Sequence, residues 1–167
     1  MIYGDVFERL EAEGVRYVVV GGAAVVLHGY ERPIKDLNIV VDPAPAEARR
    51  ATAAMMSLGF VPTLPLPLEM LTVLTMLDGA GRSVDVFARF RIPFDELWPA
   101  SERVSAGGSV ARVCSIEHLI RVKRLVTRPD DPKDIEALLA IERARAANEA
   151  READEASVAK SERRDTE

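Results

Sequence analysis

The stretch RPIKDLNIVVD, residues 32–42, places two oxygen-bearing side chains where they could meet a cation. Asp36 and Asn38 stand two residues apart in an otherwise apolar, strand-like segment. Because side chains alternate along a strand, both point to one face, about 7 Å apart along the backbone. The pair is therefore a candidate metal site, and the alternative is the polar edge of a sheet.

A second carboxylate, Asp85, interrupts another apolar strand-like stretch, SVDVF. A buried carboxylate is costly unless it has a partner. A cation would supply that partner, and so would an arginine such as Arg89. The residues alone leave these two explanations open.

Two glycines, Gly21 and Gly22, separate a strand-like stretch from a short helix in VVVGGAAVVLHG. Glycines at such a turn let the backbone approach a ligand, and the free N–H groups of the helix suit a phosphate. Neither G-x-G-x-x-G nor Gly-Lys-Ser/Thr is present, which excludes the dinucleotide and P-loop patterns. The alternative is an ordinary tight turn.

Basic residues gather on a late helix, IRVKRL, which carries Lys123 and Arg124. They form either a solvated basic face or a contact to a triphosphate or an RNA backbone. The chain has two histidines, which excludes a zinc site built from several of them.

The composition is that of one globular domain of 167 residues with a formal charge of −5. No apolar run is long enough to span a bilayer, no secretory leader opens the chain, and the single cysteine, Cys114, suits a reducing compartment. We therefore expect a cytoplasmic protein with no membrane partner, and Cys114 as a buried packing residue.

The hydrophobic patterns predict a mixed α/β sheet followed by helices, in one domain over residues 1–147. The charged tail, 148–167, has no apolar stripe and is predicted to be a frayed helix or disordered. Expected helices are 3–14, 23–29, 46–59, 116–126 and 132–147; expected strands are 15–20 and 36–41, with hairpins over 70–90 and 103–113 and an irregular proline-rich loop around 62–67.

Taken in order, these pieces resemble the nucleotidyltransferase superfamily that includes DNA polymerase beta, and look closest to its small prokaryotic AbiEii-like toxin branch. The family pattern is hydrophobic-Gly-Gly/Ser, then Arg-x-Thr-x-Asp-hydrophobic-Asp, then a third Asp on a later strand, then helices bearing Lys and Asp. Here it reads VVGGAAVVLHG, RPIKDLNIVV, SVDVF, IRVKRL and DPKDIEALL.

The resemblance implies a nucleotidyltransferase-like fold with a C-terminal helical segment and Mg²⁺- or Mn²⁺-dependent transfer of a nucleotide from an NTP. The acceptor would be an RNA, a protein or a small molecule, and a toxin would have an antitoxin partner. By resemblance, Gly21 and Gly22 bind phosphates, Asp36 and Asp85 are catalytic metal carboxylates, and Lys123 and Asp134 are the nucleotide-binding residues of the late helices.

The sequence departs from this pattern at Asn38, which stands where a second metal carboxylate is expected, and at Ile34, which replaces the threonine. Mg²⁺ commonly uses one or two carboxylates plus substrate phosphates, so Asp36 and Asp85 could still hold one nucleotide-borne ion with Asn38 as an oxygen ligand. A two-metal site would be weakened. The alternative is a catalytically degenerate relative that binds a nucleotide or a protein partner.

Overall fold

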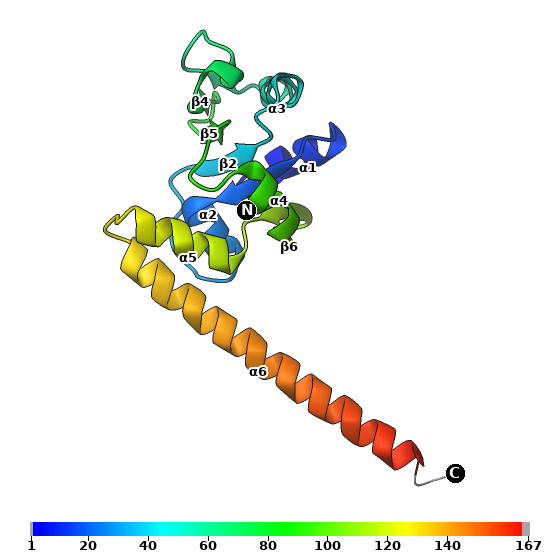
Figure 1. The fold of residues 1–167 in the computed structure, drawn as a ribbon. Helices are drawn as coiled ribbons and strands as arrows, with labels where there is room; N and C mark the ends of the chain where they lie inside the picture. Colours follow the sequence, from blue (N-terminus) through cyan, green and yellow to red (C-terminus); the bar gives the residue numbers. More distant parts are fainter. Residues whose placement is uncertain (1, 165–167) are drawn as a thin grey trace.

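The structure, a computed structural model, describes residues 2–164, in which seven strands form one mixed sheet flanked by helices (Figure 1). In spatial order the strands are β3 (Val61–Pro62), β4 (Val73–Leu77), β5 (Ser83–Phe87), β2 (Leu37–Val41), β1 (Tyr17–Val20), β7 (Ser109–Val113) and β6 (Glu102–Ala106). β1 pairs antiparallel with β2 and parallel with β7, and β2 pairs parallel with β5.

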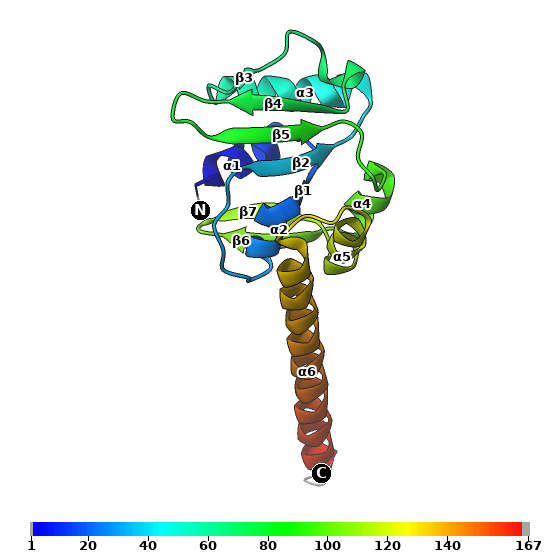
Figure 2. The same cartoon turned by 90° about the vertical axis from the view of Figure 1, so that its left-hand side faces the viewer.

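The helices divide between the two faces of the sheet (Figures 1 and 2). On one side lie α1 (Gly4–Ala12) and α3 (Pro45–Ser57), which pack against each other. On the other side lie α2 (Gly21–Leu27) and α5 (Ile116–Leu125), with the long α6 (Asp131–Arg164) beyond them. The remaining elements are the short α4 (Phe94–Ala100) and the 3₁₀ turn η1 (Leu68–Met70).

Strand alternation gives the sheet one packed face and one partly open face. In β5, Val84 and Val86 are buried against the helical layer, whereas Asp85 and Phe87 are only partly buried. We call the side of β2, β4 and β5 that carries Asn38, Thr75, Asp85 and Phe87 the open face. Register supports this grouping, because Asn38 and Thr75 both stand directly opposite Asp85.

The predicted fold class is confirmed, with a mixed sheet, flanking helices and a C-terminal helix. Both predicted hairpins form, as β4–β5 and β6–β7. Ser115 caps α5 by accepting a hydrogen bond from the backbone of His118. β2 begins at Leu37, so Asp36 directly precedes the strand that was expected to contain it.

Three short elements were not predicted. The proline-rich loop contains β3 and η1, and α4 begins after Pro93 and has Pro99 in its last turn. α4 buries only Phe94 and Leu97. A helix of seven residues with two buried side chains is too short to show a helical period in the sequence.

The segment expected to be a frayed helix or disordered belongs to α6, which runs without a break to Arg164 (Figure 1). Every residue from 142 to 164 is exposed, as the missing apolar stripe implied. Alanine, glutamate and arginine dominate this stretch, and all three favour a helix. Residues 165–167 of the predicted tail lie outside the described residues. Within residues 2–164, no helix combines the length and apolar character needed to cross a lipid bilayer.

Candidate functional site

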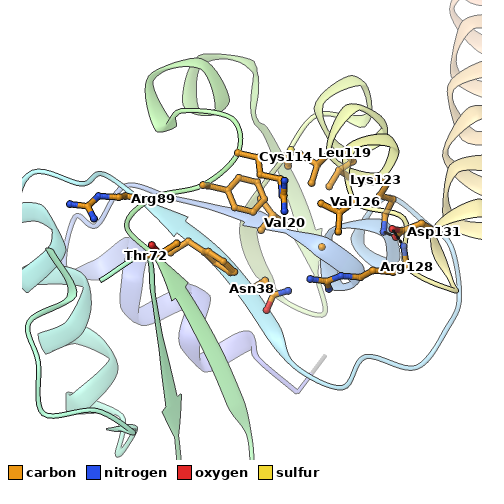
Figure 3. Close-up of a pocket in the computed structure, with 15 residues that line it drawn as sticks. Val20, Asn38, Thr72, Arg89, Cys114, Leu119, Lys123, Val126, Arg128 and Asp131 are labelled. Atoms are coloured by element: carbon orange, nitrogen blue, oxygen red, sulfur yellow. Dashed lines mark hydrogen bonds and ion pairs between the residues drawn. The ribbon is translucent and has the colours of Figure 1, made fainter. Parts of the chain in front are cut away.

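A pocket of about 410 Å³ lies between the open face of the sheet and α5, beside Gly21 (Figure 3). Much of its wall is apolar, while its lining carries four cationic side chains and one carboxylate, a balance that favours an anionic occupant. The lining residues are Val20, Gly21, Asn38, Thr72, Phe87, Arg89, Phe90, Arg91, Cys114, Leu119, Val122, Lys123, Val126, Arg128 and Asp131.

Asn38 stands at the centre of this arrangement, opposite Val20 in β1 and Asp85 in β5. Its Oδ1 is buried and has no hydrogen-bond partner among residues 2–164. A buried acceptor without a partner costs free energy in proportion to its lost hydration. The Asn38 oxygen is therefore available to a donor or cation that enters the pocket.

The double glycine makes two close approaches to side chains of the protein itself. Gly21 has a φ of 66°, and a Cβ added there would lie 2.8 Å from Asn38 Nδ2. A Cβ on Gly22 would lie 2.5 Å from Arg32 Nη2. Only glycine fits both the backbone angle and the space at position 21. Asn38 and Arg32 therefore lie close to the turn at which the sequence predicts phosphate binding.

Asp85 has a partner that the sequence did not suggest. Thr75, directly opposite in β4, donates a hydrogen bond from Oγ1 to Asp85 Oδ1 at 2.6 Å. No ion pair joins Arg89 to this carboxylate among the described residues. The hydroxyl partly compensates the burial of Asp85 and leaves the second carboxylate oxygen free of other hydrogen bonds from residues 2–164.

Asp36 lies at the amino end of β2 and is half-buried. Burial raises the pKa of the nearby Tyr3 phenol, and the negative charge of Asp36 makes a smaller contribution in the same direction. The hydrogen bond that the phenol donates to Ser83 O acts in the opposite direction and lowers the pKa. Asp36 therefore sits close enough to Tyr3 to act on it electrostatically. It does not line the pocket.

The donor set fits a metal ion only in combination with a ligand. Among residues 2–164, no three His, Cys, Asp or Glu side chains gather as a metal site. Asp36, Asp85 and the unpartnered Asn38 oxygen are nevertheless hard oxygen donors around one end of β2. Mg²⁺ accepts such a sparse protein contribution when phosphates complete its coordination.

Lys123 is engaged in a buried ion cluster that also contains Asp131, Asp134 and Arg32. Lys123 Nζ lies 2.8 Å from both Asp131 Oδ1 and Asp134 Oδ2. Asp134 Oδ2 also accepts a hydrogen bond from Arg32 Nη2 at 2.9 Å. Lys123 is 8% exposed and Asp134 is 1% exposed, so water screens these charges little. The structure thus brings Lys123 and Asp134 together, as partners of one another.

Only some of the sequence-predicted site residues line the pocket. Gly21, Asn38 and Lys123 do, whereas Asp36, Gly22, Asp85 and Asp134 do not. The sequence did not predict the part of the pocket wall that is formed by the stretch FARFR, residues 87–91. Its alternation of phenylalanine and arginine directly after the Asp85 strand was the signal that could have revealed it.

His28, which caps the C-terminal end of α2, connects α2 to α6. Its Nε2 lies 2.7 Å from the Cys114 carbonyl oxygen, which can only accept, so Nε2 carries the proton. Nδ1 then accepts from Arg145 Nη2 at 3.1 Å. Burial lowers the pKa of His28, and burial raises the pKa of the Cys114 thiol to about 12. Cys114 is 1% exposed, which confirms its predicted burial.

No protein-family model matches this sequence, and no curated protein matches it either. Several solved structures do resemble it. The lincosamide antibiotic adenylyltransferase LnuA, crystallised with lincomycin, has 16% identity and a TM-score of 0.62 over 81% of this chain and 93% of its own.

Two further structures agree with this match. ANT(2″)-Ia, in complex with adenylyl-2″-tobramycin, has 15% identity and a TM-score of 0.60 over 90% of this chain and 95% of its own. An antigenic nucleotidyltransferase-like protein from Paracoccidioides brasiliensis has 15% identity and a TM-score of 0.54 over 84% and 73%. At such identities the likeness shows the fold, which is nucleotidyltransferase-like.

Proposed function

We propose that the chain is a Mg²⁺- or Mn²⁺-dependent nucleotidyltransferase whose pocket beside Gly21 binds an NTP. The observation that carries the proposal is the buried, unpartnered Oδ1 of Asn38, a residue that lines this cationic pocket. Asp85 stands opposite Asn38 and Asp36 precedes it by two residues. Oxygen donors beside an excess of positive charge suit a metal-bound triphosphate.

Each part of the pocket would have its own role in the reaction. The apolar wall, including Phe87 and Phe90, holds the base and ribose, and the cationic lining holds the phosphates. Asp36, Asn38 and Asp85 would hold Mg²⁺, which would supply positive charge that offsets the triphosphate. The acceptor hydroxyl attacks the α-phosphorus, the bond to the β-phosphate oxygen breaks, and pyrophosphate leaves.

Asp85 is the candidate general base for the attacking hydroxyl. Thr75 holds one oxygen of its carboxylate at 2.6 Å, which fixes the carboxylate plane and leaves the other oxygen to accept the proton. A base of this kind contributes about 10²–10⁴-fold to the rate.

The acceptor is a hydroxyl of a small molecule, an RNA or a protein. LnuA with lincomycin and ANT(2″)-Ia with an adenylylated tobramycin illustrate small-molecule ligands on this fold. The resemblance to the AbiEii-like branch instead favours a toxin that modifies RNA or protein and is paired with an antitoxin. We retain both classes, because the pocket lining by itself suits the nucleotide rather than a particular acceptor.

A second candidate function is supported by two observations at the same site. Asn38 removes a negative charge from the expected metal group, and Lys123 is neutralised by two carboxylates. Both fit a catalytically degenerate relative that binds a nucleotide, or a protein partner, without transferring anything.

Incubation with each NTP labelled at the α-phosphate, with Mg²⁺ or Mn²⁺, separates these functions. Total RNA, a protein extract, lincomycin and tobramycin serve as acceptors in parallel reactions. We expect label to enter one acceptor class, and to fall by about a hundredfold or more with Asp85→Asn. Saturable NTP binding without transfer would support the degenerate relative that binds a nucleotide. Absence of NTP binding would refute the transferase and the nucleotide-binding relative, and would leave the binding of a protein partner.

A further inference from the structure

We propose that Arg128, rather than Lys123, is the side chain of this protein that contacts the triphosphate. The inference rests on the proposed function, because it assigns a residue to the NTP in the pocket beside Gly21. It also departs from the family pattern, which placed the phosphate-binding cation at Lys123.

Lys123 is already satisfied. Its ammonium group lies 2.8 Å from a carboxylate oxygen of Asp131 and 2.8 Å from one of Asp134, and the side chain is buried. To reach a phosphate it would have to abandon two carboxylates in a poorly hydrated place. Breaking one side of a buried ion pair leaves an uncompensated charge, which is strongly unfavourable.

Arg128 has the opposite character. It lines the same pocket, its side chain is exposed, and its guanidinium has no hydrogen-bond or ion-pair partner among residues 2–164. Figure 3 shows it extending from the loop between α5 and α6 toward Asn38. The free guanidinium therefore points toward Asn38, whose buried Oδ1 also lacks a hydrogen-bond partner.

The loop that carries Arg128 is held in place by the buried ion cluster. The Arg128 backbone N–H donates to Asp131 Oδ2 at 2.8 Å, and the Asp131 backbone N–H donates to Arg128 O at 3.1 Å. The other oxygen of the same carboxylate, Asp131 Oδ1, accepts from Lys123. Lys123 is thus a positioning residue, which acts on the pocket through Asp131 and the Arg128 backbone.

A guanidinium in this position suits a polyphosphate. It presents paired N–H donors that match two phosphate oxygens, and it stays charged at any physiological pH. A lysine at the same place would offer a point charge without this paired geometry. The arrangement therefore predicts that Arg128 recognises the phosphates and leaves the nucleoside to the apolar wall.

Arg124 provides a matched control. It is exposed on α5, carries the same charge, and does not line the pocket. The experiment compares Arg128→Ala, Arg128→Lys and Arg124→Ala with the parent by calorimetric titration of the preferred NTP with Mg²⁺, and of the corresponding nucleoside. Melting temperatures confirm that each variant is folded.

We expect Arg128→Ala to weaken NTP binding by about tenfold or more, since a charge-assisted hydrogen bond is lost. Nucleoside binding should stay near the parent value, Arg128→Lys should be intermediate, and Arg124→Ala should match the parent. Parental NTP affinity in Arg128→Ala, or an equal loss of nucleoside affinity, would overturn the inference while leaving the proposed function standing. If the parent binds no NTP, the proposed function fails and this inference fails with it.

Discussion

Two polar groups, one on each side of the pocket, differ in how far the protein satisfies them. In the buried ion cluster, Lys123 and Arg32 meet the carboxylates of Asp131 and Asp134. On the open face, the oxygen of Asn38 has no partner, and Asp85 has a single hydroxyl. The charges of the first group are paired within the fold, even though Arg32 Nε and Asp134 Oδ1 have no hydrogen-bond partner of their own among residues 2–164. Within the same residues, the second group has no cation of the protein in an ion pair with its oxygens.

The difference separates a structural role from a binding role for residues that the family pattern grouped together. Charges that are neutralised in a buried cluster hold α6 against α5 and the turn at Gly22. Oxygens without a protein partner can gain from a ligand what they lost on burial. We therefore expect changes in the cluster to lower stability and changes on the open face to alter ligand response.

The largest expected effect is on the cluster. Lys123→Met leaves Asp131 and Asp134 buried beside an apolar side chain, and should lower the free energy of unfolding by about 3–5 kcal/mol. Arg124→Met, on the exposed side of α5, should change it by less than about 1 kcal/mol. Urea unfolding of both variants measures the contrast. Equal, small losses would mean that the cluster contributes little to the fold.

A smaller loss is expected at the glycine turn. Gly21→Ala forces a side chain into a left-handed conformation with φ of 66° and against the Asn38 amide. We expect a loss of about 1–2 kcal/mol, together with weaker nucleotide binding because Asn38 must move. Gly79→Ala is the control, since nothing lies within 4 Å of a Cβ there. If Gly21→Ala keeps the stability of the parent and binds nucleotide equally well, the position of Asn38 does not affect ligand binding.

The smallest effect concerns His28, which joins α2 to Arg145 of α6. Its pKa is lowered from 6.5 by burial, so the folded state holds the neutral ring while the unfolded state takes up a proton first. The stabilisation is complete above about pH 6.5 and is lost as pH falls, by less than about 1.4 kcal/mol per pH unit. Unfolding from pH 7.5 to 5 should show a flatter slope in His28→Gln. Parallel slopes would mean that His28 is not the titrating group.

The main helices and strands were predictable because their hydrophobic patterns are long or are bounded by clear turn and capping residues. The hairpin around residues 78–81 combines two strands with a glycine turn, and α5 has both an N-cap serine and an apolar stripe. For the tail beyond residue 148 the sequence left a frayed helix and disorder as alternatives, because this stretch has helix-favouring residues but no apolar stripe to bury. The short β3 and α4 offered too few residues for a period.

The site was only partly predictable, since a sequence pattern gives residue types without their partners. It singled out Asn38 and Lys123, and both line the pocket. It could not show that Lys123 is neutralised by Asp131, which depends on how α6 packs against α5. Nor could it show Thr75 beside Asp85, because cross-strand register decides that contact.

The central claim, that the Asn38 oxygen faces a cation bound with a nucleotide, is tested most directly by Asn38→Asp. The substitution is nearly isosteric and adds one negative charge beside Asp85. Without ligand, this charge should repel its neighbours and lower the melting temperature at neutral pH. With Mg²⁺ and NTP the repulsion becomes attraction, so the variant should gain more thermal stability from the ligands than the parent does. A metal-dependent shift no larger than that of the parent would contradict the account.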